Sequence, residues 1–242
     1  MDTVGGWNKG TRAGSAVPST RGIYRRDDVF AFRCVVQREV LADWAKRRRP
    51  FGWPCADVIN DVINLDAQLV PVGCKGSINR GMEWRICFIY GELKLTDTLN
   101  ECQYKLYILL KMINKELLHP ICSGEMSSYI MKNVTFWVVE THSQEIFRYE
   151  HPMHVLQIAL KFLQTALVDN NLPYYMIPER NLLVGRTTEK ERTGLISKIE
   201  ELINEGERII YRLPNYARLW RLSLSTNLNK RESVGTNWNF WS

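Results

Sequence analysis

The stretch Glu83-Trp84-Arg85-Ile86-Cys87-Phe88-Ile89-Tyr90-Gly91 decides how this chain divides. Its residues Trp84, Ile86, Phe88 and Tyr90 alternate with Arg85, Cys87 and Ile89, which is the period of a strand with one face in a core. Before the stretch, short apolar segments are broken by Pro and Gly, whereas helical periodicity follows it. We therefore expect a strand over 83–91 that joins an α/β part to a helical part. Arg85, on the other face of this strand, is expected at a cleft between the two parts.

The composition is that of a globular protein. The 242 residues are 45% hydrophobic and 24% charged, with a net charge of +6. No window approaches eighteen uncharged apolar residues, so no membrane span is expected. The six cysteines form no C-x-x-C pair, which favours reduced thiols in a cytoplasmic or nuclear protein. The mild positive charge is compatible with nucleotide phosphates or nucleic acid as partners, and it proves neither.

The first part of the chain shows short and mixed patterns. Residues 1–22 are rich in Gly, Ser, Thr and Arg and lack a period, so they are predicted to be a flexible leader. A short helix is expected from Ala56 to about Asn64, and a strand over 68–73. The basic run Lys46-Arg47-Arg48-Arg49 allows two interpretations. It is either the solvated last turn of a helix or a patch that contacts nucleic-acid phosphates.

The second part is helical. Apolar residues at three- and four-residue steps predict a helix from about Leu99 to Leu117. Ser127-Ser128 is a suitable N-cap for a second helix, and a third, nearly all apolar, is expected over 155–167. A capped amphipathic helix follows from about Thr188. Residues 206–242 have no clear period, and their structure is not predicted.

Six short segments occur in an order that resembles the C-terminal part of a known family. They are Trp44 with Arg47-Arg48, Phe51-Gly52-Trp53-Pro54, Val70-Pro71-Val72-Gly73, Glu83-Trp84-Arg85, Ser127-Ser128-Tyr129 and Ile177-Pro178-Glu179-Arg180-Asn181-Leu182-Leu183. Over about residues 27–185 the chain is similar to the male-abnormal-twenty-one (Mab) family, which includes the cyclic GMP-AMP synthase-like receptors of innate immunity. The resemblance implies an α+β protein: an incomplete nucleotidyltransferase-type α/β core over 23–91, then a helix-hairpin-helix-like domain over 92–205.

In active members of that family, carboxylates hold two magnesium ions that activate a ribose hydroxyl against an α-phosphate. This chemistry needs two acids at i and i+2 on one strand, shortly after a Gly-Ser turn. Gly14-Ser15 is followed only by the adjacent pair Asp27-Asp28, and Gly76-Ser77 by Glu83 with Arg85 at the partner position. The resemblance implies that Asp27 is a metal-binding acid, with Asp28 as its off-by-one rival. The chain is therefore expected to be an N-terminally truncated member. Mg²⁺ or Mn²⁺ and ATP or GTP are expected only if a full-length relative is active.

The resemblance also implies a nucleotide site. Arg85 would contact a base, Ser128 the triphosphate, Tyr129 would stack on a base, and Lys111 or Lys105 would contact a phosphate. Each of the first three has a structural alternative: an ion-paired strand arginine, a helix N-cap and a packed tyrosine. A zinc site is not expected, because no His and Cys cluster occurs near residues 120–126 or before Cys102, the two alternative places that the resemblance implies for the zinc insert of the vertebrate synthase.

Two classes of function remain. The first is a catalytically incompetent binding or scaffold module that derives from a nucleotidyltransferase. The second is a fragment of a metal-dependent nucleotidyltransferase that makes a cyclic dinucleotide on sensing nucleic acid. The absence of an acid pair favours the first for this chain.

Overall fold

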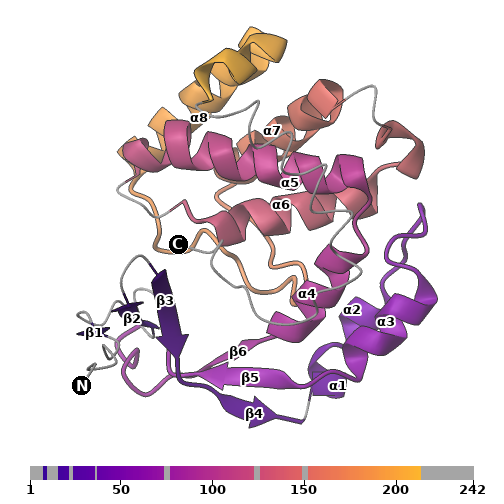
Figure 1. Cartoon of the computed structure of the whole chain (residues 1–242), viewed down its shortest axis with the longest axis vertical. Helices are drawn as coiled ribbons and strands as arrows, with labels where there is room; N and C mark the ends of the chain where they lie inside the picture. Colours follow the sequence, from indigo (N-terminus) through magenta and orange to yellow (C-terminus); the bar gives the residue numbers. More distant parts are fainter. Residues whose placement is uncertain are drawn as a thin grey trace, which may run out of the picture.

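The computed structural model describes residues 8–9, 16–21, 24–35, 37–73, 77–122, 126–148 and 152–213. Strands dominate the first third of the chain and helices the remainder, which confirms the α+β class (Figure 1). The elements up to the last strand are β1 (Asn8–Lys9), β2 (Ala16–Arg21), β3 (Tyr24–Val29), β4 (Phe32–Cys34), α1 (Gln37–Val40), α2 (Ala42–Lys46), α3 (Ala56–Ile63), β5 (Ala67–Val70) and β6 (Arg85–Cys87).

The helical part includes one π-helical turn and three 3₁₀ segments. Its elements are α4 (Ile89–Asp97), α5 (Glu101–Ile113), the π-helix η1 (Asn114–Leu118), η2 (His119–Ile121), α6 (Ser128–Thr141), η3 (Gln144–Ile146), α7 (Pro152–Val168), α8 (Glu189–Glu205) and η4 (Gly206–Arg212). None of the described helices is long and apolar enough to cross a membrane.

The strand predicted over 83–91 is shorter than expected. Only Arg85–Cys87 forms β6, and the helix α4 begins at Ile89. Trp84 and Tyr90 are 49% and 51% exposed, whereas Phe88 is buried. The alternating pattern runs across two elements, because Phe88, Glu92 and Leu95 also satisfy the spacing of one buried helix face.

Two small antiparallel sheets lie at one end of the molecule (Figure 1). In the sheet β4-β5-β6, the central strand β5 pairs Leu69 with Phe32 and with Ile86, and Val70 with Arg85. The other sheet has the order β1-β2-β3. The strands β1 and β2 fall within residues 1–22, for which the sequence predicted a flexible leader. These strands are held by backbone hydrogen bonds, β1 to β2 and β2 to β3, which a hydrophobic period in the sequence does not show.

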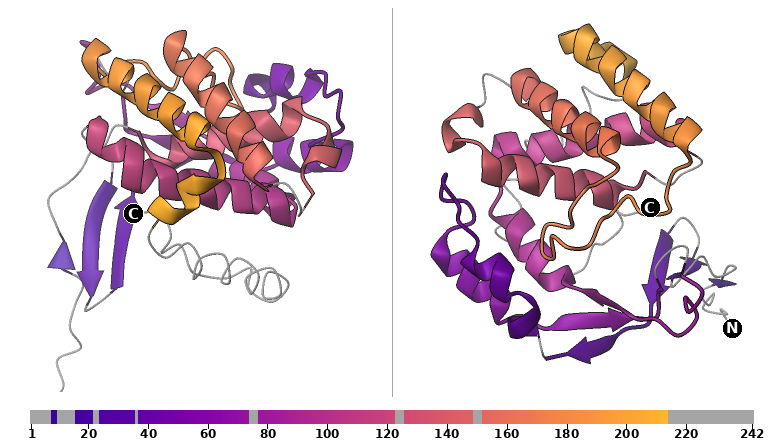
Figure 2. Two further views of the ribbon diagram at one scale, coloured as in Figure 1. Left: turned by 90° about the horizontal axis from the view of Figure 1, so that it is seen from above. Right: turned by 180° about the vertical axis from the view of Figure 1, so that it is seen from behind.

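The helices α5 to α8 form the larger end of the molecule, and α4 connects them to the sheet β4-β5-β6 (Figures 1 and 2). The helix α5 begins with a capping box between Asn100 and Gln103, and α8 with one between Thr188 and Glu191. The helix α7 packs against α5, α6 and α8, which explains why it is apolar almost all round. Its buried residues include Val155, Leu156, Ala159, Leu160, Leu163 and Leu167.

The helical part extends beyond the predicted end at 205. The 3₁₀ segment η4 follows α8 directly, and both Ile209 and Leu213 are buried in the common core. The rest of the tail, 214–242, lies outside the described residues.

Candidate functional site

A pocket of about 650 Å³ opens where the sheet β4-β5-β6 meets the helical part. Its walls come from the segment after β5, the strand β6, the start of α4, the start of α6 and the link between α7 and α8. The lining residues are Val72, Gly73, Arg80, Glu83, Trp84, Arg85, Cys87, Phe88, Ile89, Glu92, Ser127, Tyr129, Arg180, Asn181, Leu182, Val184 and Arg186. Four arginines and several apolar or aromatic side chains therefore face one hollow.

The buried residue Glu92 lines this pocket. Its Oε1 accepts hydrogen bonds from the hydroxyls of Tyr129 (3.0 Å) and Tyr174 (2.8 Å), and Lys132 ion-pairs with its Oε2. Lys132 balances the charge of the carboxylate and the two hydroxyls orient it, so its oxygens already have partners. Burial, followed by the nearby charge of Glu92, raises the pKa of both tyrosines well above the usual range. They remain neutral donors at physiological pH.

Arg180 joins the helical part to the sheet across the pocket. Its Nη1 donates a 3.0 Å hydrogen bond to the carbonyl oxygen of Ile86 in β6, and its guanidinium lies 5.0 Å from the ring centroid of Tyr174. The adjacent Asn181 holds the link between α7 and α8 in shape, because its Oδ1 accepts from the amides of Leu172 and Leu183. Arg180 and Asn181 therefore form a structural network where the helical part meets the sheet.

The structure brings together some of the predicted nucleotide-binding residues. Arg85 and Tyr129 both line the pocket, but Ser127 lines it in place of Ser128. Ser127 is also the N-cap residue of α6, yet its side chain makes no capping hydrogen bond. Tyr129 has its hydroxyl committed to Glu92, and its ring packs against Tyr174 at a centroid distance of 5.9 Å. The packed-tyrosine alternative therefore describes most of what Tyr129 does here.

A comparison with protein families bears directly on the helical half. The Mab-21 protein HhH/H2TH-like domain matches residues 102–201, which include α6 and α7 and most of α5 and α8. Residues 102–201 are thus similar to the C-terminal domain of the Mab-21 family. The match agrees with the family that the order of the short motifs predicted. The pocket lies at the edge of the Mab-21 domain, since Ser127, Tyr129 and Arg180 fall inside the match and Arg85 falls before it.

The two lysines proposed as phosphate contacts are both within α5 of the Mab-21 domain, and neither lines the pocket. Lys105 is buried and ion-pairs with Glu101. The ammonium of Lys111 lies 5.7 Å from the ring centroid of Tyr107. Burial, together with the charge of Lys132, lowers the pKa of Lys111. Lys111 is therefore not among the residues that line the pocket, and it lies close enough to Lys132 to be affected by its charge.

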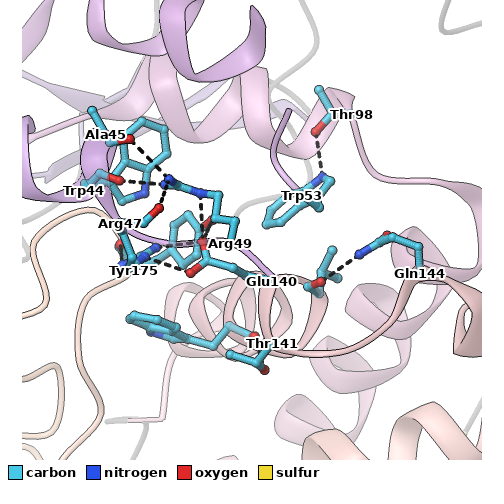
Figure 3. Close-up of polar contacts among 12 residues, drawn as sticks. Trp44, Ala45, Arg47, Arg49, Trp53, Thr98, Glu140, Thr141, Gln144 and Tyr175 are labelled. Carbon is cyan, nitrogen blue, oxygen red and sulfur yellow. Dashed lines mark hydrogen bonds and ion pairs between the residues drawn. The ribbon is translucent and has the colours of Figure 1, made fainter. Parts of the chain in front are cut away.

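Two of the four cations in the basic run preceding Pro50 contact the Mab-21 domain (Figure 3). Arg47 and Arg49 turn inward to the buried Glu140 of α6, with nitrogen–oxygen distances of 2.8 and 3.2 Å. Lys46 and Arg48 stay exposed. The four cations therefore do not form one continuous surface, because every second side chain of the run is neutralised inside the protein. A nucleic-acid patch, as predicted from the sequence, would keep only Lys46 and Arg48.

The metal-binding acid predicted from the family resemblance is Asp27. Its backbone lies in β3 and pairs with Pro18 of β2, but its side chain is outside what the structure describes. Among the described residues, no group of three or more His, Cys, Asp and Glu side chains lies close enough together to hold a metal ion. The two carboxylates of the pocket have other partners: Glu92 has those given above, and Glu83 accepts from the hydroxyl of Ser77. The described donors therefore do not fit a two-magnesium site.

Sequence reasoning missed several residues of the pocket. Glu92 fell between the strand predicted over 83–91 and the helix predicted from about Leu99, and no pattern there showed that it would be buried beside Lys132. Arg80 and Arg186 lie in irregular segments, where side-chain direction has no period to read. Trp84 was assigned to a buried face, although its half-exposed indole lines the pocket. Arg180 was quoted only within the family motif over 177–183, with no role in the site.

Proposed function

We propose that this Mab-21 protein binds a nucleotide in the pocket between β6 and the helical domain, and that this chain acts as a binding module without nucleotidyl transfer. The observation that carries the proposal is the combination of arginines, apolar walls and engaged carboxylates around one hollow of about 650 Å³. A pocket of this size matches a small organic ligand. We include in this proposal that the protein acts in innate immunity, as the cyclic GMP-AMP synthase-like receptors do.

The charge of the pocket favours phosphate groups. Within the described part of the chain, neither Arg80 nor Arg85 forms an ion pair with a carboxylate. Guanidinium groups present planar forks of donors that fit phosphate oxygens. The N-terminus of α6, at Ser127, adds first-turn amides and the positive end of a helix dipole. Phosphates would therefore find donors from both the sheet side and the helical side.

The apolar walls favour a ligand that is more than a phosphate. Val72, Phe88, Leu182 and Val184 line the pocket together with the indole of Trp84. A nucleotide combines an anionic end with a flat, weakly polar base, so it can use both kinds of wall. The engaged carboxylates support binding over catalysis, because a two-metal transfer needs carboxylates that are free to coordinate ions.

Nucleotide affinity of the whole chain tests the proposal. ATP and GTP should bind by calorimetry without added metal, and Arg85→Ala should weaken binding by about 10-fold or more, as expected for loss of a charge-assisted contact. Arg208→Ala is the matched control, because Arg208 is exposed in η4 and does not line the pocket. No binding by the folded parent, or equal affinity of both variants, would contradict the proposal.

A separate assay addresses the alternative of an active enzyme. The chain is incubated with ATP, GTP and Mg²⁺ or Mn²⁺, with and without double-stranded DNA or RNA. We expect no dinucleotide above the protein-free control. A cyclic or linear dinucleotide product would instead support the metal-dependent nucleotidyltransferase. Binding of the nucleic acid itself should be weak and lost at moderate salt, since only Lys46 and Arg48 of the basic run are exposed.

A further inference from the structure

Trp84 occupies an unusual position for a large aromatic residue. It stands directly before β6, beside Arg85, and it lines the pocket while 49% of its surface stays exposed. Its indole does not hang free, because the ring of Phe32 in β4 packs against it at a centroid distance of 5.4 Å and an interplanar angle of 56°. Trp84 is therefore a supported aromatic surface at the rim of the pocket.

Tyr129, the residue that the family resemblance implied for base stacking, is not available in the same way. Its hydroxyl is bound to Glu92, its ring packs against Tyr174, and the ammonium of Lys132 lies 5.0 Å from its ring centroid. A ligand that stacked on Tyr129 would have to compete with these contacts. Trp84 has a ring contact with Phe32 and otherwise a large exposed surface.

We propose that Trp84 is the stacking surface for the base of the bound nucleotide, so that the pocket selects aromatic-ring-bearing phosphates over plain polyphosphates. This inference rests on the proposed nucleotide binding and adds its recognition of the base. An indole offers the largest aromatic face among side chains, and stacking on it does not depend on the identity of the base. The pocket should thus distinguish nucleotides from ring-free anions more strongly than it distinguishes ATP from GTP.

The neighbouring charges give the ligand its direction. Arg85 directly follows Trp84 in the sequence, and Arg80 lies in the turn that precedes Trp84. Both arginines line the pocket. A base against Trp84 therefore leaves the phosphates within the cationic part of the same hollow. The support from Phe32 matters because a ring that is already held in place loses little conformational freedom on binding.

The experiment compares two probes and three variants. ATP and inorganic tripolyphosphate are titrated into the parent chain and into Trp84→Ala, Trp84→Phe and Phe32→Ala, each checked for folding by circular dichroism. Trp84→Ala should weaken ATP binding by about 5- to 100-fold, the range for loss of one base–aromatic stack. The same variant should bind tripolyphosphate with the affinity of the parent chain. Trp84→Phe should retain most of the ATP affinity, and Phe32→Ala should show a smaller loss than Trp84→Ala.

The outcomes separate this inference from the proposed function. If ATP binds the parent, is weakened by Arg85→Ala and is unaffected by Trp84→Ala, the stacking role is overturned and nucleotide binding stands. An equal loss of affinity for ATP and for tripolyphosphate in Trp84→Ala would also overturn the stacking role, because it would mean that the indole only orients the arginine side chains.

Sedimentation velocity is run alongside. Self-association of the parent that Trp84→Ala and Phe32→Ala abolish, with ATP affinity unchanged, would assign this aromatic surface to a second copy of the chain. If Trp84→Ala does not fold, Trp84→Leu preserves apolar volume without a ring and replaces it.

Discussion

The guanidinium of Arg47 donates a 2.9 Å hydrogen bond to Oε2 of Glu140, across 93 residues of sequence. The same guanidinium lies 4.5 Å from the ring centroid of Trp137 and 4.7 Å from that of Tyr175, and the hydroxyl of Tyr175 donates to Glu140 at 2.6 Å. Figure 3 shows Arg49 approaching the same carboxylate. One buried acid on α6 thus holds the segment after α2 and the link between α7 and α8.

Loss of this acid should destabilise the whole protein. Glu140→Ala leaves two guanidiniums without their common partner in a largely buried place, so the free energy of unfolding should fall by about 3–5 kcal/mol. Chemical denaturation monitored by tryptophan fluorescence measures the change. Glu145→Ala, at an exposed position in η3, should stay within about 0.5 kcal/mol of the parent. Equal stability of the two variants would show that the Glu140 network contributes nothing to stability.

Gly73 should be intolerant of a methyl group, in contrast to Gly81. A Cβ at Gly73 would lie 2.3 Å from the carbonyl oxygen of Arg80, so the backbone that carries Arg80 into the pocket would have to move. A Cβ at Gly81 would meet nothing within 4 Å. Gly73→Ala should cost about 1–3 kcal/mol of stability and weaken ATP binding. Gly81→Ala should change neither quantity, and a reversed order in thermal melting and calorimetry would contradict this packing argument.

Cys87 should react slowly with alkylating reagents. Burial raises the pKa of its thiol above the usual 9.0, and the nearby guanidinium of Arg180 only partly opposes this. A raised pKa lowers the thiolate fraction at any given pH, so the reaction rate should climb only as the pH passes above 9.0. Mass spectrometry after iodoacetamide pulses should show the exposed Cys55 modified first at pH 7.5. Bound ATP should slow the alkylation of Cys87 further, since Cys87 lines the pocket. Faster labelling of Cys87 than of Cys55 would refute the prediction.

Amide exchange should be slowest in α7. Leu156, Leu160 and Leu163 are at most 1% exposed and lie within a long helix that three other helices surround. Val70 belongs to a three-stranded sheet of short strands, and Val72 follows that strand in an irregular segment. Local opening should therefore be easier in the sheet than in α7. Hydrogen exchange by NMR would contradict this if Val70 and Val72 were protected longer than the three leucines.

The sequence by itself determined the helical half. Apolar spacing predicted α5, α6, α7 and α8 to within a few residues, because each buries apolar side chains at helical steps and because α5 and α8 begin with capping boxes. It also predicted that Arg85 and Tyr129 lie at the junction of the two parts. These features are local: the period and the cap residues lie within a few turns of one another.

Tertiary structure alone decided which polar side chains meet. The run 46–49 has the same composition throughout, yet Glu140 draws in Arg47 and Arg49 and leaves Lys46 and Arg48 in solvent. Likewise, Glu92 is buried beside the pocket only because α6 and the link after α7 bring Lys132, Tyr129 and Tyr174 to it. A buried charge is stable only beside its partners. Those partners come from segments distant in the sequence, and local sequence patterns do not predict that the segments meet.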